Sequence, residues 1–255
     1  MRIEELELVS NRPVADGYFV LDLHKRGGLP GILPGQFVQF RVDNDKNTFL
    51  RRPISVYDID YDRGIISLLI KKVGSGTRAM AGLYKGMKVN LVYPLGNSFS
   101  LPGPQQRSLL VGGGVGVAPL LLLARVMKGK SLDFKFLLGY QSVDHIIEKQ
   151  RYSELAELLI TTDDGSYGYK GLITEHPELA GDDYDNIYCC GPEAMMKSVA
   201  GIARSKGKFC EVSLENTMAC GYGVCLCCVE DTVKGNVCTC TEGPVFNINE
   251  LRWQI

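Results

Sequence analysis

The stretch Leu109–Ala124, LLVGGGVGVAPLLLLA, decides the fold of this 255-residue chain. It is apolar throughout, but it contains four glycines and a proline. It is also shorter than the roughly 18 to 20 apolar residues that a membrane span requires. The pattern instead predicts a buried strand, a glycine turn and a buried helix that begins near Pro119. A strand that leads through such a turn into a helix is typical of a parallel α/β sheet.

The segments that follow continue the alternation of strand and helix. We expect strands over Phe134–Leu138, Leu159–Thr162 and Ile187–Cys189, and helices over Ser153–Leu158 and Glu193–Lys206. Strands that alternate with helices indicate a doubly wound parallel sheet. The sequence therefore predicts an α/β domain over residues 102–209.

The residues before this domain have a different sequence pattern. Residues 1–101 contain short alternating segments separated by turn residues such as Gly27-Gly28 and Asp62-Arg63-Gly64. The expected strands are Gly17–Leu23, Gln36–Val42, Ile54–Tyr57, Ile65–Lys71 and Lys88–Tyr93. This pattern predicts a small antiparallel β barrel, joined to the α/β domain by the linker LPGPQQR at Leu101–Arg107.

Composition excludes several classes of partner. The chain has 28 Lys and Arg against 29 Asp and Glu, so no excess charge attracts nucleic acid or an anionic membrane. Met1–Ser10 has no feature of a secretory signal, and reduced thiols are the cytosolic default. We therefore expect a soluble cytoplasmic protein with no nucleic-acid or membrane partner.

Two glycine loops are placed to bind phosphate groups. The first, Gly76-Thr77, follows a strand and precedes a helix expected over Arg78–Tyr84, and Arg52 offers a permanent positive charge. A plain capped turn is the alternative for this loop. The second contains Gly112, Gly113, Gly114 and Gly116, whose lack of side chains permits close approach to a pyrophosphate. It departs from the G-x-G-x-x-G fingerprint, so it does not predict an ordinary Rossmann site.

Seven of the nine cysteines lie in residues 210–255, which we expect to form a small metal-dependent module. Cys220, Cys225, Cys228 and Cys240 have the spacing C-x4-C-x2-C-x11-C, which is the plant-type spacing for a [2Fe–2S] cluster. Gly221 and Gly223 allow a tight loop whose N–H groups face the cluster sulfurs. A zinc site built from Cys225, Cys228, Cys238 and Cys240 is the alternative. Under the iron hypothesis Cys227 and Cys238 are spare, and we expect them to be buried packing residues.

Cys190 is the remaining cysteine of interest. It ends an expected strand, where ligands of open α/β sheets bind, and Gly191-Pro192 follow it. On its own, however, the residue is better explained as a buried core cysteine.

Taken together, these motifs resemble a known superfamily. A barrel with Arg-Pro-x-Ser, followed by Gly-Gly-Gly-x-Gly-x-Ala-Pro and Cys-Gly-Pro, is similar to the ferredoxin–NADP reductase superfamily. The block from Met218-Ala-Cys220 to Gly243-Pro-Val-Phe246 resembles the electron-transfer subunits of the NAD-dependent, class 1B dihydroorotate dehydrogenases. This resemblance extends over essentially the whole chain.

The resemblance implies specific cofactor sites. It implies FAD binding by Arg52, Pro53, Ile54, Ser55, Leu69, Ile70, Lys71, Gly76 and Thr77. It implies a [2Fe–2S] cluster on Cys220, Cys225, Cys228 and Cys240, and NAD beside the loop at Gly112–Gly116 with Cys190 near the nicotinamide. NAD is favoured over NADP because no arginine cluster follows Leu138-Gly139-Tyr140, and because Asp163 and Asp164 would repel a 2′-phosphate.

The resemblance also implies a partner and a pathway. A catalytic subunit with its own FMN would oxidise dihydroorotate in pyrimidine biosynthesis, in a heterotetramer with two copies of each chain. This chain would then pass the electrons through the cluster and FAD to NAD+. Three alternatives remain at this stage. One is the small FAD and [2Fe–2S] subunit of an NADPH-dependent ferredoxin or sulfide oxidoreductase, and another is a zinc-stapled binding module without redox function. The third, a self-sufficient reductase that acts without a partner, is disfavoured because the sequence shows no base that resembles a dihydroorotate site.

Overall fold

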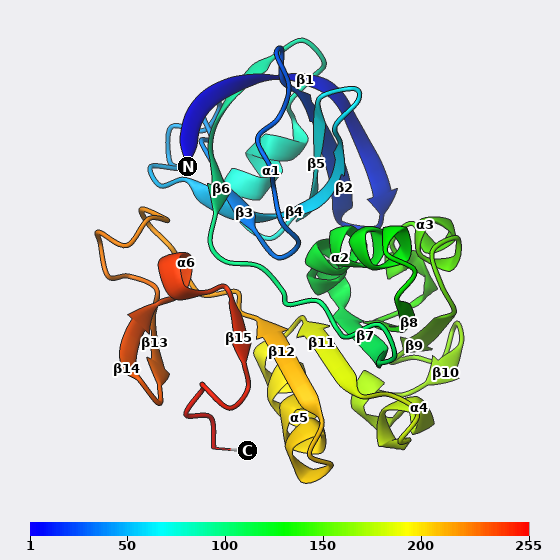
Figure 1. Ribbon diagram of the computed structural model, residues 1–255. Helices are drawn as coiled ribbons and strands as arrows, with labels where there is room; N and C mark the ends of the chain where they lie inside the picture. Colours follow the sequence, from blue (N-terminus) through cyan, green and yellow to red (C-terminus); the bar gives the residue numbers. More distant parts are fainter. Residues whose placement is uncertain (255) are drawn as a thin grey trace.

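In the computed structural model, which describes residues 1–254, six strands close into an antiparallel barrel (Figure 1). Their order around the barrel is β1 (Arg2–Ala15), β2 (Tyr18–His24), β5 (Ile65–Lys71), β4 (Arg52–Asp60), β3 (Phe37–Phe40) and β6 (Lys88–Leu95). Leucine, valine and phenylalanine side chains at alternate positions fill the interior, as expected for a barrel of this size. The predicted barrel is thus confirmed, with the long strand β1 added at its N-terminal end.

The short helix beside the barrel begins earlier than predicted. The sequence placed it over Arg78–Tyr84, but α1 spans Ser75–Ala81. Gly74 is extended, and the Thr77 hydroxyl oxygen accepts hydrogen bonds from the backbone N–H groups of Val73 (2.9 Å) and Gly74 (3.1 Å). These bonds fix the loop so that the first helical turn starts at Ser75.

A seven-stranded sheet forms the second domain. Its order is β10 (Tyr169–Lys170), β9 (Leu158–Thr162), β8 (Asp133–Tyr140), β7 (Arg107–Gly113), β11 (Asn186–Cys190), β12 (Phe209–Ser213) and β15 (Val245–Asn247). All neighbours pair in parallel except β12 and β15. The strand order reverses between β7 and β11, which is where ligands bind in sheets of this type.

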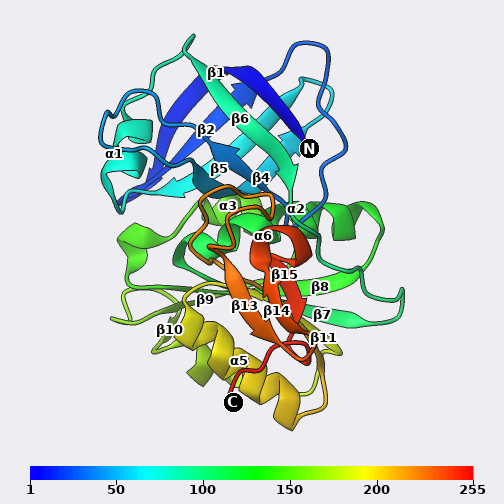
Figure 2. The same ribbon diagram turned by 90° about the vertical axis from the view of Figure 1, so that its left-hand side faces the viewer.

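Helices cover both faces of the sheet, so it is doubly wound as predicted (Figures 1 and 2). On one face α2 (Ala118–Gly129) lies between the sheet and barrel strand β4, and on the other α5 (Glu193–Ser205) packs against β11 and β12. The remaining helical segments are short: η1 (Gly114–Val117), η2 (Val143–His145), α3 (Lys149–Ser153), η3 (Ile173–Glu175) and α4 (Pro177–Ala180).

The helix predicted over Ser153–Leu158 is wrong. The helical turn α3 ends at Ser153, and residues 154–156 form a turn, closed by the hydrogen bond from the N–H of Leu155 to the carbonyl oxygen of Tyr152 (3.0 Å), before β9 begins at Leu158. In the described part of the chain, residues 1–254, no helix is long and apolar enough to cross a membrane.

Ion pairs hold the two domains together on the side of the barrel that faces α2 and α3. Glu148 accepts hydrogen bonds from Arg12 (2.8 Å) and Tyr57 (2.8 Å) of the barrel, and Asp58 pairs with Arg125 of α2 (2.9 Å) and with Arg151 of α3. Burial opposes ionisation of Glu148, but these hydrogen bonds and the nearby arginines outweigh it and lower its pKa. The charged groups therefore fix how the barrel sits on the sheet.

The C-terminal residues leave the sheet and return to it. After β12 come a loop with no regular structure, the hairpin β13 (Val229–Thr232) and β14 (Gly235–Cys238), and α6 (Thr239–Glu242). The chain then rejoins the sheet as β15. The module boundary that we predicted between residues 209 and 210 therefore falls inside β12, whose buried residues pair with β11. Figure 2 shows the loop lying beneath the barrel.

Candidate functional site

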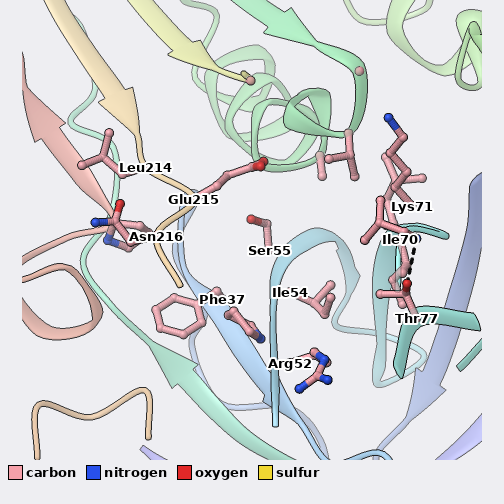
Figure 3. Close-up of a pocket in the computed structure, with 18 of the residues that line it drawn as sticks. Phe37, Arg52, Ile54, Ser55, Ile70, Lys71, Thr77, Leu214, Glu215 and Asn216 are labelled. Carbon is pink, nitrogen blue, oxygen red and sulfur yellow. Dashed lines mark hydrogen bonds between the residues drawn. The ribbon is translucent and has the colours of Figure 1, made fainter. Parts of the chain in front are cut away.

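A cavity of about 460 Å³ opens between the barrel and the sheet, at the point where the strand order reverses. It gathers predicted site residues from four parts of the fold. These are Arg52, Pro53, Ile54 and Ser55 of β4, Leu69, Ile70 and Lys71 of β5, Thr77 of α1, and Gly113 and Gly114 where β7 meets η1. Figure 3 shows Ser55 and Ile54 in the middle of the cavity, with Arg52 and Thr77 toward one end. We call this cavity the barrel pocket.

Arg52 is positioned by backbone groups rather than by a carboxylate. Its Nη1 donates to the carbonyl oxygen of Leu50 at 2.7 Å. Gly76 leaves room for it, since a Cβ at Gly76 would lie 2.9 Å from the Arg52 Nε. Gly76 is absent from the cavity wall, so its contribution is the space that it leaves for the guanidinium. A free guanidinium edge in a cavity suits a phosphate group.

The opposite wall of the barrel pocket contains residues that the sequence did not predict. Phe37, Leu214, Glu215, Asn216 and Met218 line the cavity, and Figure 3 shows Glu215 pointing into it across from Ser55. Most of them follow β12, and nothing in the local sequence places them beside the barrel. The one feature of the sequence that could have predicted them is their position just after a strand of the parallel sheet, where ligands bind.

Cys190 lies behind this wall. Its side chain is 1% exposed, and its thiol lies 3.9 Å from Oε1 of Glu215. Cys190 lines neither cavity, whereas its neighbours Gly191 and Pro192 do. Burial raises the pKa of the Cys190 thiol, and loss of solvation in the cavity wall raises the pKa of Glu215, although solvent reaches its carboxylate through the opening. Cys190 is therefore a neutral thiol, unsuited to act as a nucleophile.

A second cavity of about 370 Å³ adjoins the first, and we call it the sheet pocket. The two share Lys71, Gly113, Gly114 and Pro192. Polar groups of the sheet pocket include Gln141, His145 and Asp163, and the hydroxyl of Tyr140 is buried there without a hydrogen-bond partner. Asp163 lines the sheet pocket, Asp164 does not, and the described lining residues include no arginine.

Gly112 and Gly116 pack within the protein and line neither pocket. A Cβ at Gly112 would lie 2.9 Å from Val117 and 3.0 Å from Leu120. A Cβ at Gly116 would lie 2.4 Å from the carbonyl oxygen of Cys190. These two glycines let η1 lie close against the ends of β8 and β11, and this places Gly113 and Gly114 between the pockets.

The four predicted cysteine ligands lie together. The side chains of Cys220 and Cys225 contact one another, as do those of Cys228 and Cys240. Backbone N–H groups point at the sulfurs: those of Tyr222 and Val224 lie 3.4 Å from Sγ of Cys220, and that of Gly223 lies 3.1 Å from Sγ of Cys240. Gly221 and Gly223 have φ angles of +82° and +85°, which side chains rarely adopt.

The environment of these thiols favours negative charge at the exposed end of the group. Burial opposes ionisation of Cys220, but backbone N–H donors outweigh it and lower its pKa to about 6. Across residues 1–254, no group of three or more His, Cys, Asp or Glu side chains is arranged to hold a single metal ion. The thiols form two contacting pairs instead.

The spare cysteines differ from one another. Cys238 is half-buried and packs beside Cys228 and Cys240, as expected. Cys227 is exposed, so its predicted packing role is wrong. It follows Leu226, whose φ is +57° and whose side chain is 64% exposed.

An apolar cluster connects the cysteines to the barrel pocket. Phe37 and Met218 line the pocket, and both pack with Cys228 and Cys240 in one buried group. The cysteine site and the barrel pocket therefore share a wall, just as the barrel pocket and the sheet pocket share residues.

Comparison with known proteins agrees with this arrangement. The family described as "Iron-sulfur cluster binding domain of dihydroorotate dehydrogenase B" matches residues 215–252, and "Oxidoreductase NAD-binding domain" matches residues 110–201. A protein of Lysinibacillus sphaericus named dihydroorotate dehydrogenase B (NAD(+)), electron transfer subunit, is 35% identical over 96% of this chain and 97% of its own length. A protein of the same name from Bacillus mycoides is 34% identical, with coverage of 98% and 99%.

Solved structures share the fold. A structure titled as an NADH-dependent reduced ferredoxin–NADP oxidoreductase is 30% identical, with a TM-score of 0.87 and coverage of 97% of this chain and 90% of its own. Phthalate dioxygenase reductase is 18% identical with a TM-score of 0.69, and the alignment covers 91% and 87% of the two chains. The second likeness shows the fold alone.

Proposed function

This chain belongs to the family of electron-transfer subunits of the NAD-dependent dihydroorotate dehydrogenase B, and from that premise we propose which of its residues bind each cofactor and carry the electrons. Its cofactors are FAD, a [2Fe–2S] cluster and NAD, and it passes electrons from a catalytic partner subunit to NAD+. The predicted zinc alternative is wrong, since the cysteine module matches an iron–sulfur family.

FAD occupies the barrel pocket in this proposal. Arg52 binds a phosphate, and Thr77 holds the adjoining loop in place. Pro53, Ile54, Ser55, Leu69 and Ile70 supply a largely apolar wall from β4 and β5 that fits a flat ring. Bound flavin supplies the exchange between single electrons and a hydride.

The cluster is held by Cys220, Cys225, Cys228 and Cys240. Four thiolates are the ligand set of a plant-type [2Fe–2S] cluster, which transfers one electron at a time. The two contacting pairs of thiols and the N–H groups aimed at their sulfurs support this assignment. Phe37 and Met218 exclude water between this site and the barrel pocket.

NAD binds in the sheet pocket and reaches the flavin across the shared residues. Asp163 can accept hydrogen bonds from ribose hydroxyls and would repel a 2′-phosphate. Gly113 and Gly114 allow the nicotinamide to lie close to the flavin, and Lys71 stands between the two pockets. The observation that carries the proposal is this order of sites: cysteines, barrel pocket and sheet pocket, each sharing a wall with the next.

The catalytic partner docks over the cysteine loop in this proposal. Apolar side chains around the cysteines face outward: Tyr222 is 48% exposed, Val224 74% and Leu226 64%. Such a group of exposed apolar side chains is typical of an interaction site.

We propose that the assembly is a heterotetramer with two copies of each chain. We propose the cytoplasm as its compartment, where reduced thiols are the default.

The test of the cofactor assignment is an absorption spectrum of the anaerobic protein before and after NADH. Flavin and iron–sulfur bands that both bleach are expected. A spectrum without iron–sulfur absorption, or one that NADH leaves unchanged, would refute the assignment.

The proposed docking surface is tested with Val224→Asp, which should weaken assembly with the catalytic subunit. Val233→Asp, at a residue 57% exposed in the β13–β14 turn, should not weaken it.

A second candidate function is favoured by one observation. The solved structure at 30% identity is named an NADH-dependent reduced ferredoxin–NADP oxidoreductase. The small subunit of such an oxidoreductase would share all three sites. Because that oxidoreductase is named as NADH-dependent too, the nucleotide does not separate the two functions, and the partner subunit does. We expect this chain to co-purify with a subunit that oxidises dihydroorotate; co-purification with an iron–sulfur-rich large subunit that does not would favour the alternative.

A further inference from the structure

Gln39 has a buried amide with no hydrogen-bond partner. Its side chain is 0% exposed, and both Nε2 and Oε1 lack a partner. Among residues 1–254 it is the one buried side chain with two polar atoms left unpaired. Burial of an unpaired amide is costly, so such a group in a native protein requires an explanation.

The amide lies against the cysteine loop. A Cβ at Gly221 would lie 2.5 Å from Cγ of Gln39 and 2.6 Å from its Nε2. Gly221 directly follows Cys220, whose sulfur already accepts backbone N–H groups from the same loop. The contact is too close for a water molecule between Gln39 and the loop backbone, so a bound water cannot satisfy the amide on this side.

The backbone of Gln39 is held in place by its contacts within the barrel. It lies in β3, opposite Pro53 of β4, and its carbonyl oxygen accepts a hydrogen bond from Nη1 of Arg51 at 3.2 Å. The same guanidinium bonds the carbonyl oxygen of Asn90 at 3.1 Å, which joins β3 to β6. The amide therefore sits on a rigid part of the barrel and cannot move away from the loop without breaking these contacts.

We propose that Gln39 is a positioning residue for the iron–sulfur site, and that its amide N–H donates a hydrogen bond to a sulfur on the Cys220 side of the bound cluster. This inference rests on the proposed cluster site. A sulfur of an anionic cluster accepts hydrogen bonds only, so the NH₂ end of the amide faces it and the oxygen faces away. The bond pairs Nε2 of the amide, while Oε1 stays without a partner, and it tightens the loop against the barrel.

The proposed hydrogen bond from Gln39 should raise the reduction potential of the cluster. Reduction adds one negative charge to the cluster, and a donor aimed at a sulfur stabilises the reduced state more than the oxidised state. Loss of the donor should therefore make the cluster harder to reduce, so that electrons pass less readily from the partner subunit to this chain.

The test is Gln39→Met in the full chain, which keeps the length of the side chain and removes the amide. In a redox titration followed by electron paramagnetic resonance, we expect a tenfold loss of reduced cluster at a fixed potential, which is about 59 mV for a one-electron couple. Gln36→Met is the control: Gln36 precedes β3, and its amide is already bonded to Leu33 and Gly96. It should leave the cluster potential unchanged.

An unchanged reduction potential of the cluster together with a higher melting temperature in Gln39→Met would overturn the proposal. Such a result would show that the amide is a buried polar group that bonds nothing. If the variant does not assemble a cluster, the unaltered protein decides the question. With glutamine side chains labelled with ¹⁵N, pulsed paramagnetic resonance of the reduced cluster should detect a coupled nitrogen, and its absence would overturn the proposal. A protein with no cluster signal at all would instead refute the proposed function.

Discussion

Gly116→Ala tests whether the loop after β7 is held by packing. The added Cβ would lie 2.4 Å from the carbonyl oxygen of Cys190 and 2.5 Å from the nitrogen of Gly191. Both are backbone atoms, so no side-chain rotation relieves the collision, and η1 must move away from β11. Overpacking of this kind costs about 1 to 3 kcal/mol. We expect the upper end, which corresponds to a melting temperature lower by about 6 to 12 °C for a chain of this size.

The same displacement should slow hydride transfer. Gly113 and Gly114 line both pockets and move with η1, so flavin reduction by NADH should slow at least tenfold while the iron–sulfur spectrum stays unchanged. Gly129→Ala is the matched control: it lies at the end of α2 with nothing within 4 Å of an added Cβ. That change should stabilise the protein by about 0.5 to 1 kcal/mol. A Gly116→Ala protein that melts with the parent and reduces its flavin at the parent rate would refute the reasoning.

Three further outcomes follow from the sites and the domain contact. Arg52→Met should weaken FAD binding about 10- to 100-fold in a titration of the flavin-free protein, because a charged hydrogen bond contributes about 1.5 to 3 kcal/mol; unchanged binding would remove Arg52 from the phosphate site. Cys225→Ser should lose the iron–sulfur spectrum and keep the flavin, whereas Cys227→Ser should keep both. The pKa of Glu148 is lowered in the folded protein, so its stabilisation is complete above the unfolded value of about 4.3 and is lost as pH falls through the folded value. Glu148→Gln should therefore lower the free energy of unfolding at pH 7 by about 1 to 3 kcal/mol, and the difference from the parent should shrink in acid; a constant difference would contradict the assigned pKa direction.

The barrel, the sheet and most residues that β4 and β5 contribute to the barrel pocket were predictable from the sequence because their signals are local. Alternating strands, a glycine turn after a buried strand and the Arg52–Ser55 tetrad each occupy a few consecutive residues. That Cys220, Cys225, Cys228 and Cys240 lie near one another was predictable for the same reason, since the spacing of the four cysteines is a short-range pattern. These are features in which chemistry constrains the chain over short distances.

What the sequence did not predict depends on contacts between distant segments. Glu215 and Met218 follow β12, and only the fold brings them to the barrel. Gly112 and Gly116 look like cofactor glycines in the sequence, yet their neighbours are Val117 and the backbone of Cys190. A sequence shows that a glycine is needed at such a position, but whether a ligand or another part of the protein approaches it is a tertiary property.

The packing on strand β3 shows why the cysteine module cannot move independently of the barrel. Its four residues are all buried: Val38 and Phe40 point into the barrel core, while Phe37 and Gln39 point outward, where the C-terminal residues cover them. Asn97 after β6 adds hydrogen bonds to the carbonyl oxygens of Glu242 and Val245. Movement of the module would expose Phe37 and the Gln39 amide together. The cysteines therefore stay at a fixed separation from the barrel pocket, and the electron transfer that we propose between the two sites requires no domain motion.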